Sequence, residues 1–123
     1  MTKTEIMADV DQNTITRSKF IANNTVKYTL KDGTQIIRLY KTDIITFHTD
    51  GMIELNTGGY YTRTTKDRLN RFQPFNIHQK NYVWYVESEN LPFYDGIKLN
   101  HVIVYGAVKS DANPDKRKIV WKW

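Results

Sequence analysis

The stretch TVKYTLKDGTQIIRLYKTDIITFHTDGMIEL, residues 25–55, decides the fold of this chain. It holds two pairs of apolar-rich segments, and an Asp-Gly dipeptide separates the two members of each pair, at Asp32-Gly33 and at Asp50-Gly51. Asp-Gly between two apolar runs is a strong signal for a β-hairpin, because the tight turn needs positive φ angles that Gly tolerates. We therefore predict strands at residues 25–30, 34–40, 44–47 and 52–55.

Outside this stretch, the pattern predicts further strands at residues 60–63, 82–87, 102–105 and 119–123. A short helix is predicted at about residues 65–72, because Leu69 and Phe72 are three apart and Pro74 does not continue a helix. The expected fold class is α+β, mostly antiparallel β, as a small single domain of hairpins with one or two short helices. Residues 1–24 are predicted as an N-terminal arm or short helix, and residues 25–123 as an antiparallel β-rich ligand-binding domain.

Composition narrows the class of protein. The chain has 123 residues, 40% of them hydrophobic and 25% charged, which suits one globular domain. It contains no cysteine, which excludes disulfides, thiolate chemistry and cysteine metal sites. No apolar run approaches membrane-spanning length, so we expect a soluble cytoplasmic protein. The net charge of +5 favours anionic partners but is modest for a nucleic-acid binder, so nucleic acid is not expected as the main ligand.

Residues 56–71 carry most of the candidate chemistry. Thr64 followed by Asp67 fits a helix cap, and free amides at the first turn of a helix attract phosphate. Gly58-Gly59 allows a ligand to approach the backbone closely. The segment also offers hydroxyl donors, guanidinium groups for bidentate phosphate contacts, an aromatic face for stacking and an amide. These groups are Thr57, Thr62, Thr64 and Thr65; Arg63, Arg68 and Arg71; Tyr60; and Asn70.

The same residues also have purely structural explanations. A Gly-Gly pair after a strand is commonly a turn, a threonine cap is commonly only a cap, and Arg68 with Arg71 is commonly a solvated helix face. No Walker pattern is present. The basic residues 116–118 precede an apolar tail, where lysines discourage edge-to-edge pairing of an edge strand. The alternative for that tail is a surface for a partner.

The sequence offers no catalytic or metal-binding motif. His48, His78 and His101 show no helical spacing with a second ligand, so no zinc site is predicted. No Gly-x-Ser-x-Gly elbow occurs. Glu87 and Glu89 read better as a strand end and its loop than as an acid–base pair. We therefore predict a protein that is not an enzyme and has neither a metal nor a cofactor.

Residues 32–47, DGTQIIRLYKTDIITF, and residues 51–72, GMIELNTGGYYTRTTKDRLNRF, resemble a block found in small phage and prophage proteins. Among these, the chain resembles the first family of Thoeris anti-defence proteins, with weaker likeness at residues 82–86 and 93–96. The likeness does not cover the first 20 residues or the tail after Ser110. Members of that family are sponges that capture the cyclic ADP-ribose isomers made by bacterial TIR-domain proteins as an alarm.

The resemblance implies a protein that binds and sequesters such a signal without cleaving it, in the cytoplasm of the infected bacterial host. It also implies a homodimer or larger assembly, with ligand near the subunit contacts. The ligand role carries over to Tyr60, which would stack on a purine, and to Asn70, which would hydrogen-bond to base or ribose. On physical grounds Thr65, Arg68 and Arg71 are added for a pyrophosphate, and the hydroxyl of Thr62 completes the predicted ligand-binding set.

Two other functions compete with this one. The basic helix face and residues 116–118 also suit a phage inhibitor that binds a host defence protein or nucleic acid. Oligonucleotide binding that weakens steeply with salt would mark that alternative, because phosphate contacts release counterions. A phosphodiesterase would need a metal site or an acid–base pair, and the sequence supplies neither.

Overall fold

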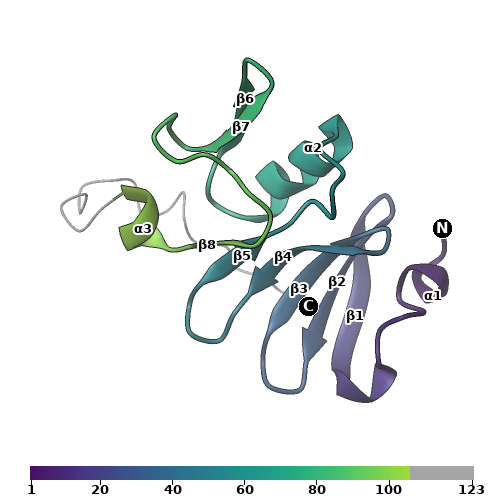
Figure 1. The fold of residues 1–123 in the computed structure, drawn as a ribbon. Helices are drawn as coiled ribbons and strands as arrows, with labels where there is room; N and C mark the ends of the chain where they lie inside the picture. Colours follow the sequence, from purple (N-terminus) through teal and green to yellow (C-terminus); the bar gives the residue numbers. More distant parts are fainter. Residues whose placement is uncertain (106–123) are drawn as a thin grey trace.

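A computed structural model describes residues 1–105 of the chain. Its main feature is a six-stranded sheet in the order β1-β2-β3-β4-β5-β8, in which every neighbouring pair is antiparallel, beside a separate β6–β7 hairpin (Figure 1). This confirms the predicted α+β, mostly antiparallel class. The elements are α1 (Lys3–Ile6), the 3₁₀ turn η1 (Gln12–Thr14), β1 (Ile15–Ala22), β2 (Thr25–Leu30), β3 (Gln35–Leu39), β4 (Thr42–Phe47), β5 (Ile53–Leu55), α2 (Arg63–Phe72), β6 (Ile77–Lys80), β7 (Val83–Val86), β8 (Ile97–Leu99) and α3 (His101–Tyr105).

The two Asp-Gly hairpins form as predicted. Gly33 and Gly51 have φ angles of 96° and 91°, which the turns require and which other residues adopt only with strain. The flanking strands then pair in register, with Tyr28 opposite Ile36 in the first hairpin and Phe47 opposite Ile53 in the second. The four central strands therefore follow directly from the local sequence.

The larger core lies on one face of the sheet. The apolar side chains of β3, β4, β5 and β8 on this face are covered by α2 and the β6–β7 hairpin, as the arrangement in Figure 1 shows. Leu69 of α2 is completely buried there, which stabilises the fold by about 1.5–3 kcal/mol. Strands β3 and β4 shift register after Ile37, and the extra residue, Ile44, turns inward beside Ile45. Both isoleucines are buried as a result.

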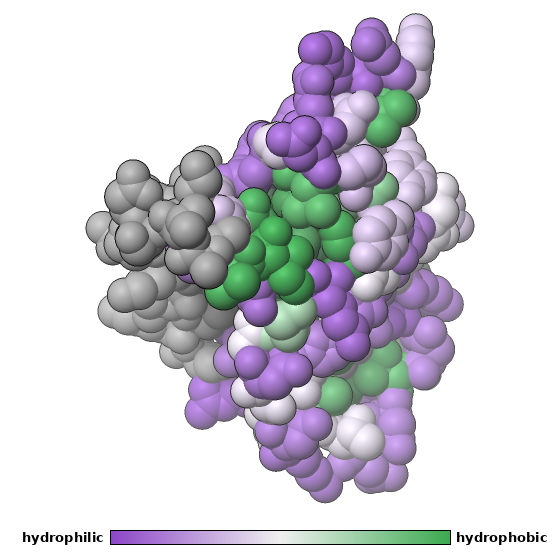
Figure 2. Space-filling view, turned by 60° about the vertical axis from the view of Figure 1, so that its left-hand side comes forward, coloured by the Kyte–Doolittle hydropathy of each residue, from purple (hydrophilic) through white to green (hydrophobic). Residues whose placement is uncertain are grey.

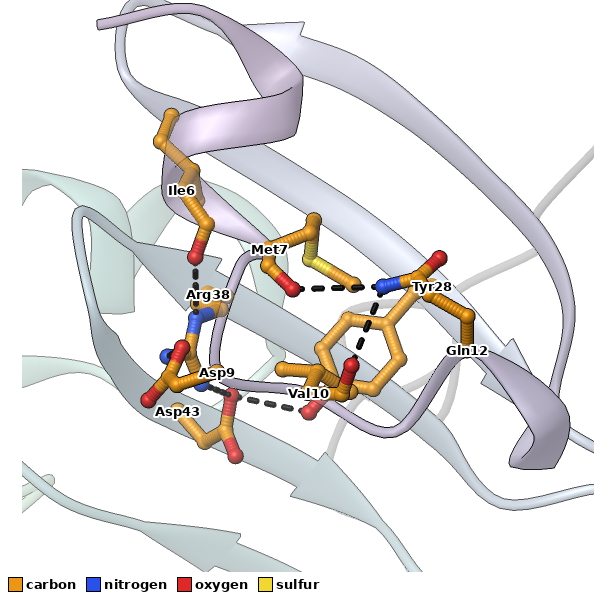
Figure 3. A network of polar contacts seen from close by, with 8 residues as sticks. All are labelled: Ile6, Met7, Asp9, Val10, Gln12, Tyr28, Arg38 and Asp43. Carbon is orange, nitrogen blue, oxygen red and sulfur yellow. Dashed lines mark hydrogen bonds and ion pairs between the residues drawn. The ribbon is translucent and has the colours of Figure 1, made fainter.

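The opposite face is covered by the N-terminal segment. Ile6 and Met7 pack on Val26, Tyr28 and Ile36. A buried guanidinium fastens this segment to the sheet (Figure 3). Arg38 Nε donates to the Ile6 carbonyl at 3.0 Å, and its terminal nitrogens donate to the carboxylates of Asp9 and, at 2.8 Å, Asp43.

The network around Arg38 compensates for the burial of its charge. Burial alone would lower the pKa of Arg38, but the hydrogen bonds and charges of Asp43 and Asp9 outweigh it and raise the pKa. The Tyr28 hydroxyl donates to the same Asp43 oxygen at 2.9 Å. A guanidinium that lost one of these carboxylates would remain buried without full compensation, which is costly. The network therefore keeps the N-terminal segment in place.

Several sequence predictions need correction. Residues 60–63 do not form a strand, because residues 60–62 connect the Gly58-Gly59 turn to α2, which begins at Arg63. Residues 102–105 belong to the helix α3, because the side chain of Asn100 accepts a hydrogen bond from the amide of Ile103 at the first turn. The predicted strand at residues 119–123 lies outside the described residues. Strands β1, β6 and β8 were not predicted.

The N-terminal 24 residues hold more than an arm. The short helix α1 is present, with Thr2 and Glu5 forming a capping box. Strand β1 follows within the same segment and pairs with β2 along the edge of the sheet. Its side chains alternate poorly between buried and exposed, which is why the periodicity of the sequence does not reveal it.

The side of the molecule that carries α3 displays an apolar patch, which Figure 2 shows beside the residues drawn in grey. Val102 and Ile103 of α3 are exposed apolar residues.

Among residues 1–105, no helix combines the length and the apolar character that crossing a bilayer requires.

Candidate functional site

The loop between β5 and α2 is fixed by one buried threonine. The Thr57 amide donates to Asp95 Oδ1 at 2.6 Å, and the Thr57 hydroxyl donates to the same oxygen at 2.8 Å. The Gly59 amide donates to Thr57 Oγ1 at 3.1 Å. Gly58 and Gly59 have φ angles of 65° and 89°, so the chain turns sharply at this point. The loop is therefore held rigidly before it presents Tyr60.

Gly58 also sets how closely the loop approaches the sheet. A Cβ atom added to Gly58 would lie 2.8 Å from both Cγ2 and Oγ1 of Thr42, at the start of β4. A Cβ atom on Gly59 would meet nothing within 4 Å. Gly58 thus allows close packing of backbone on the sheet, whereas Gly59 faces open space.

Helix α2 begins with Thr62 as its N-cap. Thr62 Oγ1 accepts from the Thr65 amide at 3.2 Å and donates to Thr65 Oγ1 at 3.1 Å. The predicted cap, Thr64 with Asp67, is therefore wrong by two positions. The cause is that the chain is extended at Thr62 (φ −109°, ψ 163°) and already helical at Arg63. Asp67 instead contacts Arg68 and Arg71.

A cavity of about 640 Å³ lies where this loop, the start of α2 and the β3–β4 turn meet. Its volume falls within the range of small-molecule sites. The lining combines aliphatic side chains, two tyrosine rings, five threonines and one lysine: Met1, Leu39, Tyr40, Lys41, Thr42, Ile44, Thr57, Tyr60, Thr62, Thr64 and Thr65. These groups suit a ligand with a flat ring and hydrogen-bond acceptors.

Three of the six predicted ligand-binding residues lie together in this cavity: Tyr60, Thr62 and Thr65. Tyr60 is 64% exposed, so its ring is available for stacking rather than packed in the core. Thr65 is buried, and its hydroxyl accepts from Thr62. The amides of Arg63 and Thr64 lie in the first turn of α2, where backbone amides have no acceptor within the helix.

The other three predicted residues do not line the cavity. Asn70 Nδ2 donates to the Ile77 carbonyl at 2.8 Å, and the Ile77 amide donates to Asn70 Oδ1 at 2.7 Å, so this amide joins α2 to β6. Arg68 donates to Thr25 Oγ1 at 2.9 Å and to the Asn23 carbonyl at 3.2 Å. Arg71 lies 3.7 Å from Asp67 and over the ring of Phe72.

Sequence reasoning missed the contribution of the β3–β4 turn, which supplies Tyr40 and Lys41 to the cavity, and of Thr42 at the start of β4. Tyr40 is held by Asn24 of the neighbouring β1–β2 turn. Its amide donates to the Asn24 carbonyl at 2.9 Å, and Asn24 Nδ2 donates to the Tyr40 hydroxyl at 3.2 Å. A tyrosine with a positive φ (51°) in a hairpin turn is the one local signal that marks this position, and it is visible only in the structure.

An aromatic cluster lies beside the cavity. Tyr61 packs edge-on against Trp84 at 4.9 Å and against Phe93 at 6.0 Å between ring centroids. Burial, followed by the charge of Asp95, raises the pKa of Tyr61. Lys66 Nζ lies 5.9 Å from the Trp84 ring. The cluster anchors residue 61, which leaves its neighbour Tyr60 free to face the cavity.

The described residues hold no group of three or more His, Cys, Asp or Glu side chains that could bind a metal ion. His48 and Glu54 form a pair at 2.9 Å, and this hydrogen bond is the main cause of the lowered pKa of Glu54. Neither residue lines the cavity. The residues that line the cavity therefore offer hydroxyls, rings, the side-chain ammonium of Lys41 and the N-terminal ammonium of Met1.

A family model covers most of this chain. No curated protein and no solved structure matched this chain. The family model described as Kyanoviridae Gp96 protein matches residues 2–100, which include every strand of residues 1–105 and all the cavity-lining residues except Met1. The chain belongs to the Kyanoviridae Gp96 protein family, a phage protein family.

Proposed function

We propose that this phage protein binds and sequesters a cyclic ADP-ribose-type signal in the cavity between the β3–β4 turn and α2, without cleaving it. The observation that carries the proposal is the meeting of Tyr60, Thr62 and Thr65 in one cavity of about 640 Å³. The resemblance to Thoeris anti-defence proteins singles out Tyr60, and the cavity provides the space that a nucleotide-sized ligand needs.

The chemistry of the lining favours binding over turnover. None of the lining residues is a histidine, a carboxylate or a cysteine, the side chains that most often transfer protons or attack a substrate. Threonine hydroxyls and tyrosine rings bind sugars, phosphates and bases without reacting with them. A sequestering protein needs tight binding from preorganised groups, and the Asp95–Thr57 contact preorganises the loop that carries Tyr60.

The proposal places the protein in the cytoplasm of the infected host, as a homodimer or larger assembly. Native mass spectrometry of the full chain mixed with cyclic ADP-ribose tests the assembly and the ligand binding in one spectrum. We expect one ligand per subunit on an oligomer, and the intact ligand after heat release. Recovery of ADP-ribose in multiple turnovers would identify an enzyme and contradict the proposal.

A second candidate is a phage inhibitor that binds a host defence protein, and one observation favours it. Tyr82, at the tip of the β6–β7 hairpin, is 95% exposed and has a φ angle of 66°. A bulky residue there costs free energy and contributes no packing to the described fold. If Tyr82→Ala abolishes anti-defence activity while ligand binding stays intact, this second function replaces the first.

A further inference from the structure

The β3–β4 turn faces the same cavity as Tyr60 but comes from a distant part of the sequence. Tyr40, Lys41 and Thr42 all line the cavity, and Tyr60 lies on the separate loop before α2. The Gly58–Thr42 packing brings these two elements together, because a Cβ on Gly58 would lie 2.8 Å from Thr42. The turn and the loop therefore form two fixed walls of one site.

Lys41 brings a charged side chain to this site. Among the described residues that line the cavity, Lys41 is the only one with a charged side chain. The arginines of α2 do not line it: Arg68 binds Thr25, Asn23 and Asp67, and Arg71 lies beside Asp67. A phosphate in the cavity would therefore meet its cationic side chain at Lys41, assisted by hydroxyl and amide donors.

Tyr40 is arranged for contact with a ligand. Its backbone has a φ angle of 51°, which is costly for a bulky residue, and its side chain is 47% exposed rather than buried in the core. Asn24 holds both its backbone amide and its hydroxyl, so the ring is oriented before any ligand arrives. Preorganised rings lose little conformational entropy on binding.

We infer that Tyr40 and Lys41 determine the ligand class of this cavity, which is a planar base joined to one or two phosphates rather than a polyanion. Tyr40 supplies a second aromatic surface in addition to Tyr60, and Lys41 contacts the phosphate. The lining residues carry two cationic groups, the Lys41 side chain and the Met1 N-terminus, which match a mono- or pyrophosphate and leave the many charges of an oligonucleotide unmatched. The inference rests on the proposed function and adds the residues that select its ligand.

The experiment uses calorimetry at low salt to compare the affinity for cyclic ADP-ribose of two variants that each lose the charge of one lysine. Lys41→Gln is expected to weaken binding about tenfold or more, as the loss of a hydrogen bond to a charged group does. The control is Lys31→Gln, since Lys31 is also an exposed turn lysine but lies in the β2–β3 turn, at the opposite end of β3. Equal affinity of Lys41→Gln and wild type would overturn the inference and leave the proposed function intact.

Calorimetry with cyclic ADP-ribose also tests Tyr40. Tyr82 is the control, because both tyrosines occupy turn positions with positive φ angles. Tyr40→Ala is expected to lower affinity at least fivefold, as the loss of a stacking ring does, and Tyr82→Ala is expected to leave affinity unchanged. Equal affinity in Tyr40→Ala would also overturn the inference.

If wild-type protein does not bind cyclic ADP-ribose, the proposed function fails, and the inference is then tested separately with adenosine and inorganic pyrophosphate. Amide NMR shifts at Tyr40 and Lys41 on addition of either probe would support it. Unchanged shifts with both probes would contradict it.

Discussion

Asp95 holds Thr57 twice, through its backbone amide at 2.6 Å and through its hydroxyl at 2.8 Å, although the two residues are 38 positions apart. Thr57 is almost completely buried, so its amide would have no solvent to replace the carboxylate. The contact joins the loop that carries Tyr60 to the segment before β8. It therefore couples the shape of the cavity to the core of the sheet.

Asp95→Ala should consequently lower the free energy of unfolding by about 2–3 kcal/mol, since it leaves a buried amide and hydroxyl without their acceptor. Urea unfolding followed by circular dichroism measures the change. Asp32→Ala is the matched control, because Asp32 accepts from one amide in an exposed turn. A loss in Asp95→Ala no larger than in Asp32→Ala would contradict the role of the Thr57 contact.

Gly58→Ala should destabilise the protein more than Gly59→Ala. Both glycines have positive φ angles, so alanine is strained at either position, but only at Gly58 would the new methyl group meet Thr42. We expect losses of about 2–4 kcal/mol and about 1 kcal/mol, respectively. Thr42→Ala should partly rescue Gly58→Ala in a double-mutant cycle. Additive effects of the two substitutions would show that they do not touch.

Stability should fall in acid because of carboxylates with lowered pKa values. Burial raises the pKa of Asp9, but the hydrogen bond and charge of Arg38 outweigh it and bring the pKa below its ordinary 3.8. The His48 hydrogen bond brings the pKa of Glu54 below 4.5. In such groups the unfolded state binds more protons, so the stabilisation is full above the ordinary pKa and is lost as the pH falls through the folded value.

The measurement is the urea midpoint between pH 6 and pH 2. The midpoint of the wild type should decline below about pH 4.5, and Asp9→Asn should decline less steeply because it lacks one of these carboxylates. If Asp9→Asn follows the wild-type curve in shape, Arg38 does not stabilise the Asp9 carboxylate.

Asn70→Ala should act on stability, whereas Tyr60→Ala should act on binding. Asn70 makes two hydrogen bonds to the backbone of Ile77, so its loss is expected to cost about 2 kcal/mol. Tyr60 is 64% exposed, so its removal should change stability by less than about 0.5 kcal/mol. Asn90→Ala, an exposed position, serves as control. A stable Asn70→Ala protein that has lost its ligand would restore Asn70 as a direct ligand contact.

The parts of the fold that the sequence predicted are those with local causes. Asp-Gly turns and the apolar runs beside them sufficed for the hairpins of β2–β5. The helix α3 was missed because the composition of residues 102–105 favours a strand, while the deciding contact is the hydrogen bond from the Ile103 amide to the Asn100 side chain. The edge strand β1 was missed because its pattern is weak and β2 supplies its pairing.

Three of the six predicted ligand-binding residues line the cavity, for a similar reason. Tyr60, Thr62 and Thr65 lie within six residues of one another, and a loop leading into a helix brings such neighbours together. Tyr40 and Lys41 join them only through the packing of the β3–β4 turn against Gly58, which no local pattern encodes. In the sequence, the arginines of α2 looked equally suitable as ligand contacts. In the fold, Arg68 instead hydrogen-bonds to Thr25 and Asn23, which lie far from it in the sequence.

The most direct test of the central claim is a calorimetric titration of the full chain with cyclic ADP-ribose, alongside Tyr60→Ala and Tyr82→Ala. We expect saturable binding by the wild type and by Tyr82→Ala, with affinity at least fivefold weaker in Tyr60→Ala because a stacking ring is lost. No saturable binding by the wild type, or equal affinity in all three proteins, would contradict it.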